Sequence, residues 1–356
     1  MANALSKVIE AIEPPDEKAM EAARKRQDEL TKPRGSLGDL EELSVKIAGI
    51  RRSPLSTLEN KAIVVMAADH GVVAEGVSAY PQAVTRQMVA NFLNDHAAIN
   101  ILAGQAGVRP VFVDMGVIGG FEPHPSLLCK MIDFGTRNMA KGPAMSRRQA
   151  LGALKAGVEV VEAQLETGLD IMGTGEMGIG NTTAASAIAA AVTGLSAAEL
   201  TGTGTGINEK QLAHKIELVE RALAVNQPSA DDAVDILAKV GGFEIGGLAG
   251  AILAAAANRV PVVIDGFISG AAALIAVKLA PRVRDYLIAA HLSAERGHRA
   301  VLGYMGLRPL LNLKMRLGEG TGAALGIFLA EASVKLLKDM LTFDEAGVSD
   351  KDGEVA

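Results

Sequence analysis

The chain contains no tryptophan, and aromatic residues make up only 3% of its 356 residues. Alanine and 39 glycines take their place. Small side chains of this kind favour helices packed closely on a sheet over the bulky core of a β sandwich. A chain of this length can form one large α/β domain with a smaller appendage, or two domains.

Cysteine is almost absent as well. The single cysteine, Cys129, excludes an intramolecular disulfide and a zinc site built from cysteines. A catalytic thiol would need a histidine base, and the nearby sequence offers only His124 as a weak candidate. We therefore interpret Cys129 as a small packing residue.

Positive charge is not in excess, because 35 basic residues face 41 acidic ones and the formal net charge is −6. Nucleic-acid-binding proteins present a basic face, so no nucleic-acid partner is expected. A small anionic ligand remains compatible with this composition, because local basic groups and backbone N–H groups bind anions whatever the net charge.

Signals for a membrane are weak. The first residues include Lys7, Glu10 and Glu13 where a signal peptide would be apolar, which predicts a cytoplasmic protein. The run 177–200 has Glu199 as its only charge and is long enough to span a membrane. It opens with Gly-Ile-Gly-Asn-Thr-Thr, which is typical of a loop followed by a buried helix, so no membrane partner is expected.

Two patterns divide the chain. The first sixty residues predict three helices, at about 3–12, 15–30 and 38–51. From residue 61, short apolar runs alternate with helical stretches, which indicates a parallel sheet covered on both faces. We expect strands at 62–67, 111–113, 131–132, 169–172, 261–264 and 286–290, and helices near 82–105, 146–166, 182–193, 208–225, 243–257, 267–279, 294–304 and 320–340.

Polar residues follow five of these strands. Ligands of such a sheet bind beyond the carboxyl ends of the strands, so we expect these residues to line one site. They are Asp69-His70, Asp114, Gly173–Gly178, Asp265 and His291–Glu295. Asp265 fits either a substrate-binding carboxylate or one that ties down loops by accepting backbone N–H groups.

A metal site is not expected there. Asp69, His70 and His291 lack the spacing of a chelating set, and the chain has no pair of histidines at i and i+4. Hydrogen bonds from these side chains to the backbone or to a sugar are favoured instead.

Two glutamates are framed by glycines. Glu319 lies between Gly318 and Gly320 at the start of an apolar helix, and Glu176 follows Gly175 and precedes Met177-Gly178. A carboxylate near a helix N-terminus is stabilised by the dipole, but this does not explain the glycines. We infer one general base and one positioning group, and we expect residues 318 and 320 to be glycine so that a flat nucleophile can approach Glu319.

The spacing of Gly173, Gly175 and Gly178 also matches the dinucleotide-binding fingerprint. An NAD(P)-dependent oxidoreductase using the 173–178 loop is therefore the alternative function. Against it, Glu176 would face the pyrophosphate that the motif exists to bind, and no clear strand leads to Glu199, where a ribose-binding acid would stand. A non-catalytic nucleotide sensor using the same loops is a third interpretation.

The segment Thr201–Gly206 precedes a helix and resembles an anion site, because glycines let successive N–H groups point at one phosphate. Lys215, two turns into that helix, could reach back to it. A flexible connection with a solvated lysine is an equal alternative. The chain has no Gly-Lys-Ser/Thr sequence there, which excludes a nucleoside triphosphate P-loop.

Taken together, these motifs resemble one family, the nicotinate-nucleotide:dimethylbenzimidazole phosphoribosyltransferases of cobalamin lower-ligand synthesis. The matching segments run in order through almost the entire chain: KPRGSLG (32–38), AADHGV (67–72), GPAMS (142–146), GTGEMGIGNTT (173–183), NQP (226–228), KVGGFEIGGLAGA (239–251), DGFISGAAAL (265–274), HLSAERGH (291–298) and RLGEGTGAAL (316–325).

The resemblance implies an α/β fold, with a Rossmann-like parallel sheet flanked by helices and a small helical domain formed from both chain ends. The small domain would comprise residues 1–60 plus about 305–356, and the large domain residues 61–304. It also implies a homodimer and no cofactor.

The implied reaction transfers phosphoribose from nicotinate mononucleotide to 5,6-dimethylbenzimidazole, with Glu319 as the general base and inversion at the anomeric carbon. Glu176 and its loop would lie near the departing nicotinate, and Lys215 and Ser293 near the phosphate. Tyr80 and Met88 would wall the base pocket, where the acceptor stays open among benzimidazoles, adenine and phenols. The implied substrate-binding set is Glu176, Gly175, Met177, Gly178, Asn181, Gly202, Gly204, Thr205, Gly206, Lys215, Ser293, Asp265, Tyr80, Met88, Leu317, Gly318 and Gly320.

Overall fold

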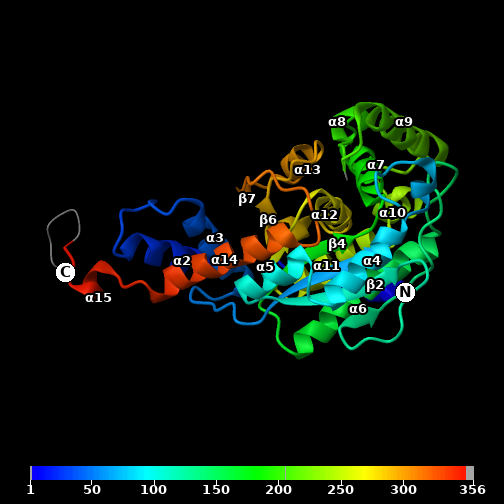
Figure 1. The fold of residues 1–356 in the computed structure, drawn as a ribbon. Helices are drawn as coiled ribbons and strands as arrows, with labels where there is room; N and C mark the ends of the chain where they lie inside the picture. The colour runs from blue at the N-terminus through cyan, green and yellow to red at the C-terminus, as the bar shows by residue number, and fades with distance from the viewer. Residues whose placement is uncertain (1, 205, 350–356) are drawn as a thin grey trace.

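The computed structural model describes residues 2–204 and 206–349. A seven-stranded sheet forms its centre, with the strand order β3-β2-β1-β4-β5-β6-β7, and every neighbouring pair is parallel (Figure 1). The strands are β1 (Lys61–Ala68), β2 (Arg109–Gly116), β3 (Leu127–Cys129), β4 (Ile171–Met177), β5 (Val262–Ile264), β6 (Leu287–His291) and β7 (Pro309–Leu311).

Helices precede, connect and follow these strands. In chain order they are α1 (Ala2–Glu10), α2 (Glu17–Glu29), α3 (Asp39–Arg51), the 3-10 helix η1 (Gly71–Glu75), α4 (Ala83–Leu93), α5 (Ala98–Ala106), α6 (Arg147–Glu166), α7 (Asn181–Thr193), α8 (Ala197–Leu200), α9 (Glu209–Asn226), α10 (Ala233–Val240), α11 (Phe243–Ala257), α12 (Phe267–Leu279), the 3-10 helix η2 (Pro281–Tyr286), α13 (His298–Met305), α14 (Thr321–Asp339) and α15 (Phe343–Ala346).

Both faces of the sheet are buried. Val64 and Met66 of β1 pack into the cluster formed with α6, α7, α11 and α12, whereas Ile63 and Val65 pack into the cluster formed with α3, α4, α5 and α14. Successive side chains of a strand point to opposite faces, so a continuous apolar run is what a two-sided sheet requires. The predicted α/β class is therefore confirmed.

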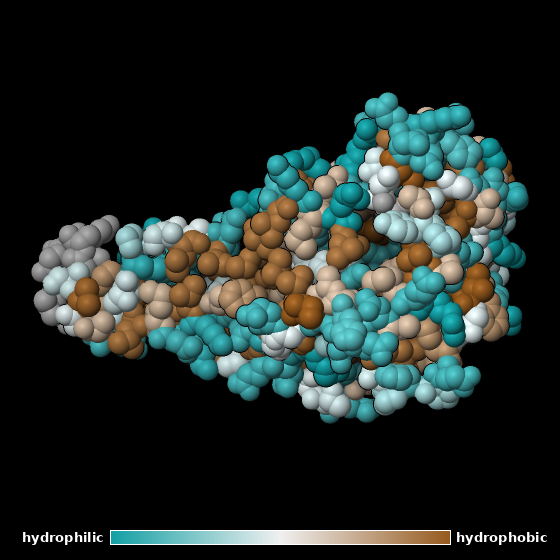
Figure 2. All heavy atoms as spheres, in the orientation of Figure 1, coloured by the Kyte–Doolittle hydropathy of each residue, from teal (hydrophilic) through white to brown (hydrophobic). Residues whose placement is uncertain are grey.

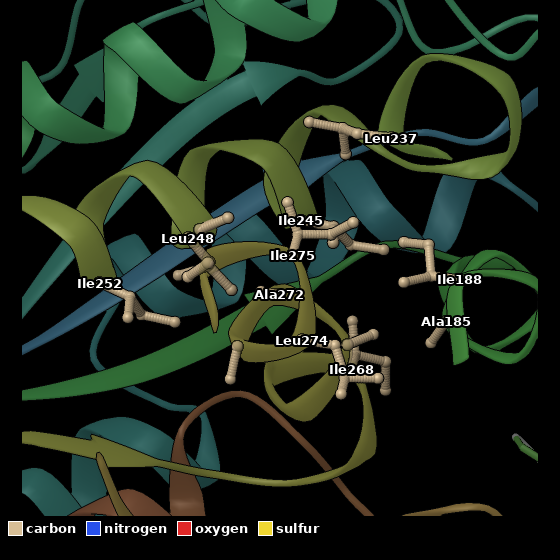
Figure 3. Packing of buried hydrophobic residues seen from close by; sticks show 14 of the residues in the cluster. Ala185, Ile188, Leu237, Ile245, Leu248, Ile252, Ile268, Ala272, Leu274 and Ile275 are labelled. Carbon is tan, nitrogen blue, oxygen red and sulfur yellow. The ribbon is translucent and has the colours of Figure 1, made fainter. Parts of the chain in front are cut away.

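Small residues allow the helices of the first face to pack closely. A Cβ at Gly250 of α11 would overlap the carbonyl oxygen of Leu154 on α6. Figure 3 shows the same layer, where Ile188 of α7, Ile245 of α11 and Ile275 of α12 converge. The shortage of aromatic rings thus corresponds to interhelical distances that large side chains would not permit.

Most predicted helices are confirmed to within a few residues. The capping spacing at Ser146 is also confirmed, because its hydroxyl accepts a hydrogen bond from the Gln149 backbone N–H at 3.2 Å. The single helix expected at 82–105 is wrong: α4 and α5 are separated by residues 94–97, where Asp95 has a φ of 59°. The sequence interpretation missed α8, α10 and the short edge strand β7.

Two strand predictions need correction. The strand expected at 131–132 lies instead at Leu127–Cys129, although the backbone N–H of Ile132 still donates to Met115 O of β2 at 3.0 Å. More importantly, β4 does not end at residue 172 but extends to Met177 between β1 and β5. The glycine-rich segment from Gly173 is therefore a strand and not a loop.

The run 177–200 does not form a single long helix. It comprises the last residue of β4, α7 and α8. In the described part of the chain, no helix is long and apolar enough to cross a membrane.

The two chain ends meet beside the sheet. Ala23 of α2, Val45 of α3 and Leu337 of α14 share a small core, and Arg26 Nε donates to Leu337 O at 2.9 Å. An isolated antiparallel bridge joins Leu30 to Thr342. Helix α1 packs elsewhere, against α11 and α6.

Candidate active site

Glu319 lies at the carboxyl edge of the sheet, one residue before the N-cap of α14. Its φ is 63°, between Gly318 at 86° and Gly320 at 92°. Three consecutive left-handed residues are costly for side-chain-bearing residues, which explains the glycines on either side. The strain at Glu319 itself points to a function for its side chain.

The Glu319 carboxyl is buried, with 4% of the residue exposed, and its Oε2 has no hydrogen-bond partner among the described residues. Burial raises the pKa of this group above its usual value, a hydrogen bond from the backbone of Ile99 opposes the shift, and the charge of Asp265 adds to it. A desolvated carboxylate with an unpaired oxygen is suited to accept a proton.

Asp265 holds this segment in place. Its Oδ1 accepts the backbone N–H groups of Gly322 at 2.7 Å and Ala323 at 3.1 Å, and its Oδ2 accepts that of Gly320 at 3.1 Å. The carboxylate therefore satisfies donors at the N-terminus of α14. Of the two interpretations of Asp265, the loop-tying one matches these contacts.

Glu176 lies on β4, and its Oε1 faces Gly318 of the segment that carries Glu319. It is 6% exposed, and Asn181 Nδ2 donates to its Oε2. Burial raises the pKa of Glu176 to about 8, and the charges of Asp265, Glu244 and Glu319 act in the same direction, whereas the Asn181 hydrogen bond opposes them.

The glycines around the two glutamates face each other across the site. A Cβ at Gly175 would lie 2.5 Å from the carbonyl oxygen of Glu319, and a Cβ at Gly318 would overlap Glu176 Oε1. A Cβ at Gly320 would lie 2.8 Å from Ile63 Cγ2. Gly175, Gly318 and Gly320 therefore have a packing reason to be glycine, separate from the expected approach of a nucleophile past residues 318 and 320.

The strand conformation of residues 173–177 also removes the dinucleotide interpretation. The fingerprint needs its glycines in the turn between a strand and a helix, where N–H groups point at a pyrophosphate. Here Gly173 and Gly175 pair within the sheet. Glu199 has a local role, because it closes a capping box with Ser196 at the start of α8.

A buried contact between a histidine and a glutamate, which the sequence interpretation missed, lies close enough to Glu176 for the charge of Glu244 to act on it. His70 Nε2 lies 2.7 Å from Glu244 Oε1, and both residues are at most 1% exposed. Glu244 is the one charged residue of α11 and follows Gly241-Gly242 by two positions. A glutamate near paired glycines at the start of an apolar helix was the signal that could have revealed it.

The anion site proposed from the sequence is partly assembled. Lys215 is 1% exposed, and its Nζ donates to Thr182 Oγ1 at 2.8 Å and to Gly202 O at 3.4 Å. Burial lowers the pKa of Lys215 to about 8, and the charge of Glu295 opposes this shift. The lysine is thus not solvated on a flexible connection. Gly206 has a φ of 104°, and Thr205 lies outside the described residues.

An arginine connects this loop to the Glu319 segment. Arg316 Nη1 donates to Gly204 O at 2.8 Å. Ser293 lies after β6 with its backbone N–H donating to His298 Nδ1 at 2.8 Å, and its hydroxyl accepts from the Glu295 N–H at 3.2 Å. The structure therefore brings the ends of β4 and β6, the glycine loop and the start of α14 together.

The two residues expected to wall the base pocket are less enclosed, because Tyr80 is 53% exposed and Met88 is half-buried. Leu317, from the implied substrate-binding set, is 58% exposed. Met88 and Met177 pack on the same apolar cluster. Gly178 is pressed against β1, because a Cβ there would overlap Ala68 O.

Among the described residues, no group of three or more His, Cys, Asp or Glu side chains is arranged to hold a metal ion. A cleft of about 1020 Å³ lies between α2, α3, β6 and β7, but it is lined by none of the residues of this site.

Comparison with known proteins defines the family. The model of a family described as "Phosphoribosyltransferase" matches residues 12–348. The nicotinate-nucleotide--dimethylbenzimidazole phosphoribosyltransferase of Desulforudis audaxviator is 57% identical over 97% of this chain and 98% of its own. That of Roseiflexus sp. (strain RS-1) is 57% identical over 98% of both chains. The chain belongs to this phosphoribosyltransferase family.

Solved structures agree with the assignment. The crystal structure of the nicotinate-nucleotide-dimethylbenzimidazole phosphoribosyltransferase from Thermus thermophilus superposes with a TM-score of 0.90 at 46% identity, over 94% of this chain and 99% of that one. The family resemblance drawn from the motifs is confirmed, and so is the Rossmann-like architecture of the phosphoribosyltransferase.

Proposed function

We propose that this phosphoribosyltransferase transfers phosphoribose from nicotinate mononucleotide to 5,6-dimethylbenzimidazole, giving α-ribazole 5′-phosphate and nicotinate for cobalamin synthesis. The observation that carries the proposal is Glu319, a buried and strained carboxylate with an unpaired oxygen, in a chain of this family.

The proposed chemistry needs one base. An unprotonated benzimidazole nitrogen attacks the anomeric carbon while the bond from that carbon to the nicotinate ring breaks. The pyridinium leaves as a neutral ring, so no general acid is required. The other benzimidazole nitrogen loses its proton to Glu319, and attack on the opposite face inverts the β linkage to α. Holding both rings in line contributes much of the remaining acceleration.

The proposed phosphate site consists of Lys215, Ser293 and the glycines at 202, 204 and 206, with Thr205 proposed from the sequence alone. A bound phosphate would favour the charged form of Lys215, whose Nζ already lies at Gly202 O and Thr182. Tyr80 and Met88 remain the proposed walls for the acceptor base, since an exposed ring can stack on a flat ligand and a thioether can adapt to it.

Incubation with substrates tests this function. Nicotinate mononucleotide and dimethylbenzimidazole should yield α-ribazole 5′-phosphate and nicotinate on a chromatogram, and parallel incubations with adenine and phenol define the acceptor range. Binding of the nucleotide without product would favour the sensor interpretation instead. Heat on titration with NAD, followed by hydride transfer, would favour the oxidoreductase.

We further propose the two-domain division at residues 1–60 plus about 305–356 and 61–304. The shared core of α2, α3 and α14 supports the small domain, whereas α1 packs on α11 and α6 and β7 pairs with β6 in the central sheet, so these two elements belong with the large domain. The proposed location is the cytoplasm, because a charged nucleotide substrate does not cross membranes unaided.

The proposed homodimer is supported by the surface. Figure 2 shows an apolar band along α14 and beside α5. Exposed apolar side chains on these helices and next to α14 are Ile101, Leu313, Leu317, Phe328 and Leu341. Contiguous apolar surface of this kind marks an interface.

We expect Phe328→Asp to convert the dimer into a monomer, because Phe328 is 55% exposed in the middle of α14 and a buried charge there would be unpaired. Light scattering after size exclusion measures the mass. Val225→Asp is the control, since Val225 is 52% exposed on the distant α9 (Figure 1). A wild-type monomer, or a Phe328→Asp dimer, would contradict the proposal.

A further inference from the structure

Four buried carboxyl groups surround the end of β4. Glu176, Glu319, Asp265 and Glu244 are exposed by 6%, 4%, 1% and 0% respectively. Carboxylates that interact in a desolvated site cannot all ionise at neutral pH without a large cost in free energy, so at least one of them retains a proton.

Three of the four have compensating partners. Asp265 accepts three backbone N–H groups, and His291 Nε2 lies 3.6 Å from its Oδ1. Glu244 is paired with His70 at 2.7 Å. Glu319 has a hydrogen bond from the backbone of Ile99.

Glu176 is the acid on which the charges of the other three act together. In the described part of the chain it receives one hydrogen-bond donor, the neutral amide of Asn181 on α7. These repulsions add to the effect of burial, and the single hydrogen bond from Asn181 opposes them. The proton that one of the four acids must retain is therefore assigned to Glu176.

We propose that Glu176 is a neutral carboxylic acid in the ligand-free enzyme at neutral pH and that its proton forms a hydrogen bond to the carboxylate of the bound nicotinate ring. Because Oε2 accepts from Asn181, the proton lies on Oε1, the oxygen that faces Gly318 and the segment carrying Glu319. The inference rests on the proposed function for the identity of the ring.

The raised pKa of Glu176 agrees with a neutral carboxylic acid at neutral pH. Burial is the main cause that raises the pKa of Glu176 to about 8, and the charge of Asp265 comes second. A carboxyl group with a raised pKa keeps its proton below that value and loses it as the pH rises through about 8.

The proton on Glu176 lets the site distinguish nicotinate, a carboxylate, from nicotinamide, an amide. Neutral Glu176 donates to the nicotinate carboxylate in a charge-assisted hydrogen bond, whereas ionised Glu176 would repel it and accept the N–H of a nicotinamide instead. Glu176 is thus a specificity-determining residue whose preference for nicotinate weakens above about pH 8.

Infrared spectroscopy of the ligand-free protein tests whether Glu176 is protonated, and this test does not depend on the proposed function. The difference between the wild type and Glu176→Gln should contain a protonated carboxyl band at pH 7 that disappears with a midpoint near pH 8. Glu162→Gln, an exposed change on α6, should leave the difference spectrum without that band. Absence of the band at pH 7 overturns the proposal, and if Glu176→Gln does not fold, a pH titration of wild-type protein carrying ¹³C-labelled glutamate by NMR answers the same question.

Calorimetry with nicotinate mononucleotide and nicotinamide mononucleotide tests the selection. The wild-type preference for nicotinate should fall about tenfold between pH 7 and pH 9, since a tenfold loss of the protonated form accompanies that rise. Glu176→Gln, which keeps a donor, should bind nicotinate mononucleotide within about threefold of wild type at pH 7 and keep its preference at pH 9. An unchanged wild-type preference overturns the inference. If neither nucleotide binds, the proposed function fails, while the proton on Glu176 is decided by the spectrum.

Discussion

Replacing Glu319 with glutamine is expected to reduce turnover by roughly 10²–10⁴-fold and to leave the affinity for nicotinate mononucleotide almost unchanged. Glutamine has the same shape but cannot accept the benzimidazole proton. The backbone of residue 319 is held through Asp265, which binds the N–H groups of Gly320, Gly322 and Ala323, so the substitution leaves the segment in position.

Single-turnover kinetics and calorimetry measure the two quantities separately. Glu166→Gln, a change at an exposed residue of α6, serves as the control and should retain wild-type turnover. The wild-type rate should decline towards acid pH with a midpoint above that of an ordinary glutamate, because burial raises the pKa of Glu319 and only the ionised form is a base. Near wild-type turnover of Glu319→Gln would reject Glu319 as the base.

Gly175→Ala is expected to have the second largest effect. The added Cβ would lie 2.5 Å from the carbonyl oxygen of Glu319 and 2.8 Å from the backbone nitrogen of Gly320. Both are backbone atoms that no rotamer change can move, so the Glu319 segment must shift. Overpacking of this kind costs about 1–3 kcal/mol of stability, and a displacement of about 1 Å in a catalytic group lowers turnover about 10²-fold.

Denaturant unfolding and steady-state kinetics measure these effects. Gly104→Ala on α5 is the matched control, because a Cβ there meets no atom within 4 Å and alanine favours a helix interior. The control should be neutral or slightly stabilising. Wild-type turnover in Gly175→Ala would show that the Glu319 segment does not depend on its contact with β4.

Several features were predictable because their causes are local in the chain. The helix at 267–279 and the start of α6 at Ser146 follow from apolar composition and a capping residue, both confirmed. Glu319 stood out because two glycines frame it, and the glycines do reflect a left-handed backbone. The ordered motifs identified the family, which the comparisons confirm.

Other features depend on contacts between distant residues. Residues 173–177 are rich in glycine and carry no local preference for a strand, and they form one because β1 and β5 pair with them on either side. Glu244 lies beside His70, which is 174 positions earlier in the chain, and its charge acts on Glu176 of β4.

By itself, the sequence determined the α/β class, the order of most elements, the family and the carboxylate that we propose as the base. Only the tertiary structure decided that the glycine fingerprint is a strand, that Gly175 and Gly318 are glycine because two segments touch, and that Glu176 lies among three other buried acids. The physical reason is that backbone preference and periodicity act over a few neighbouring residues. Desolvation and charge repulsion arise only when the sheet brings together side chains that are far apart in the chain.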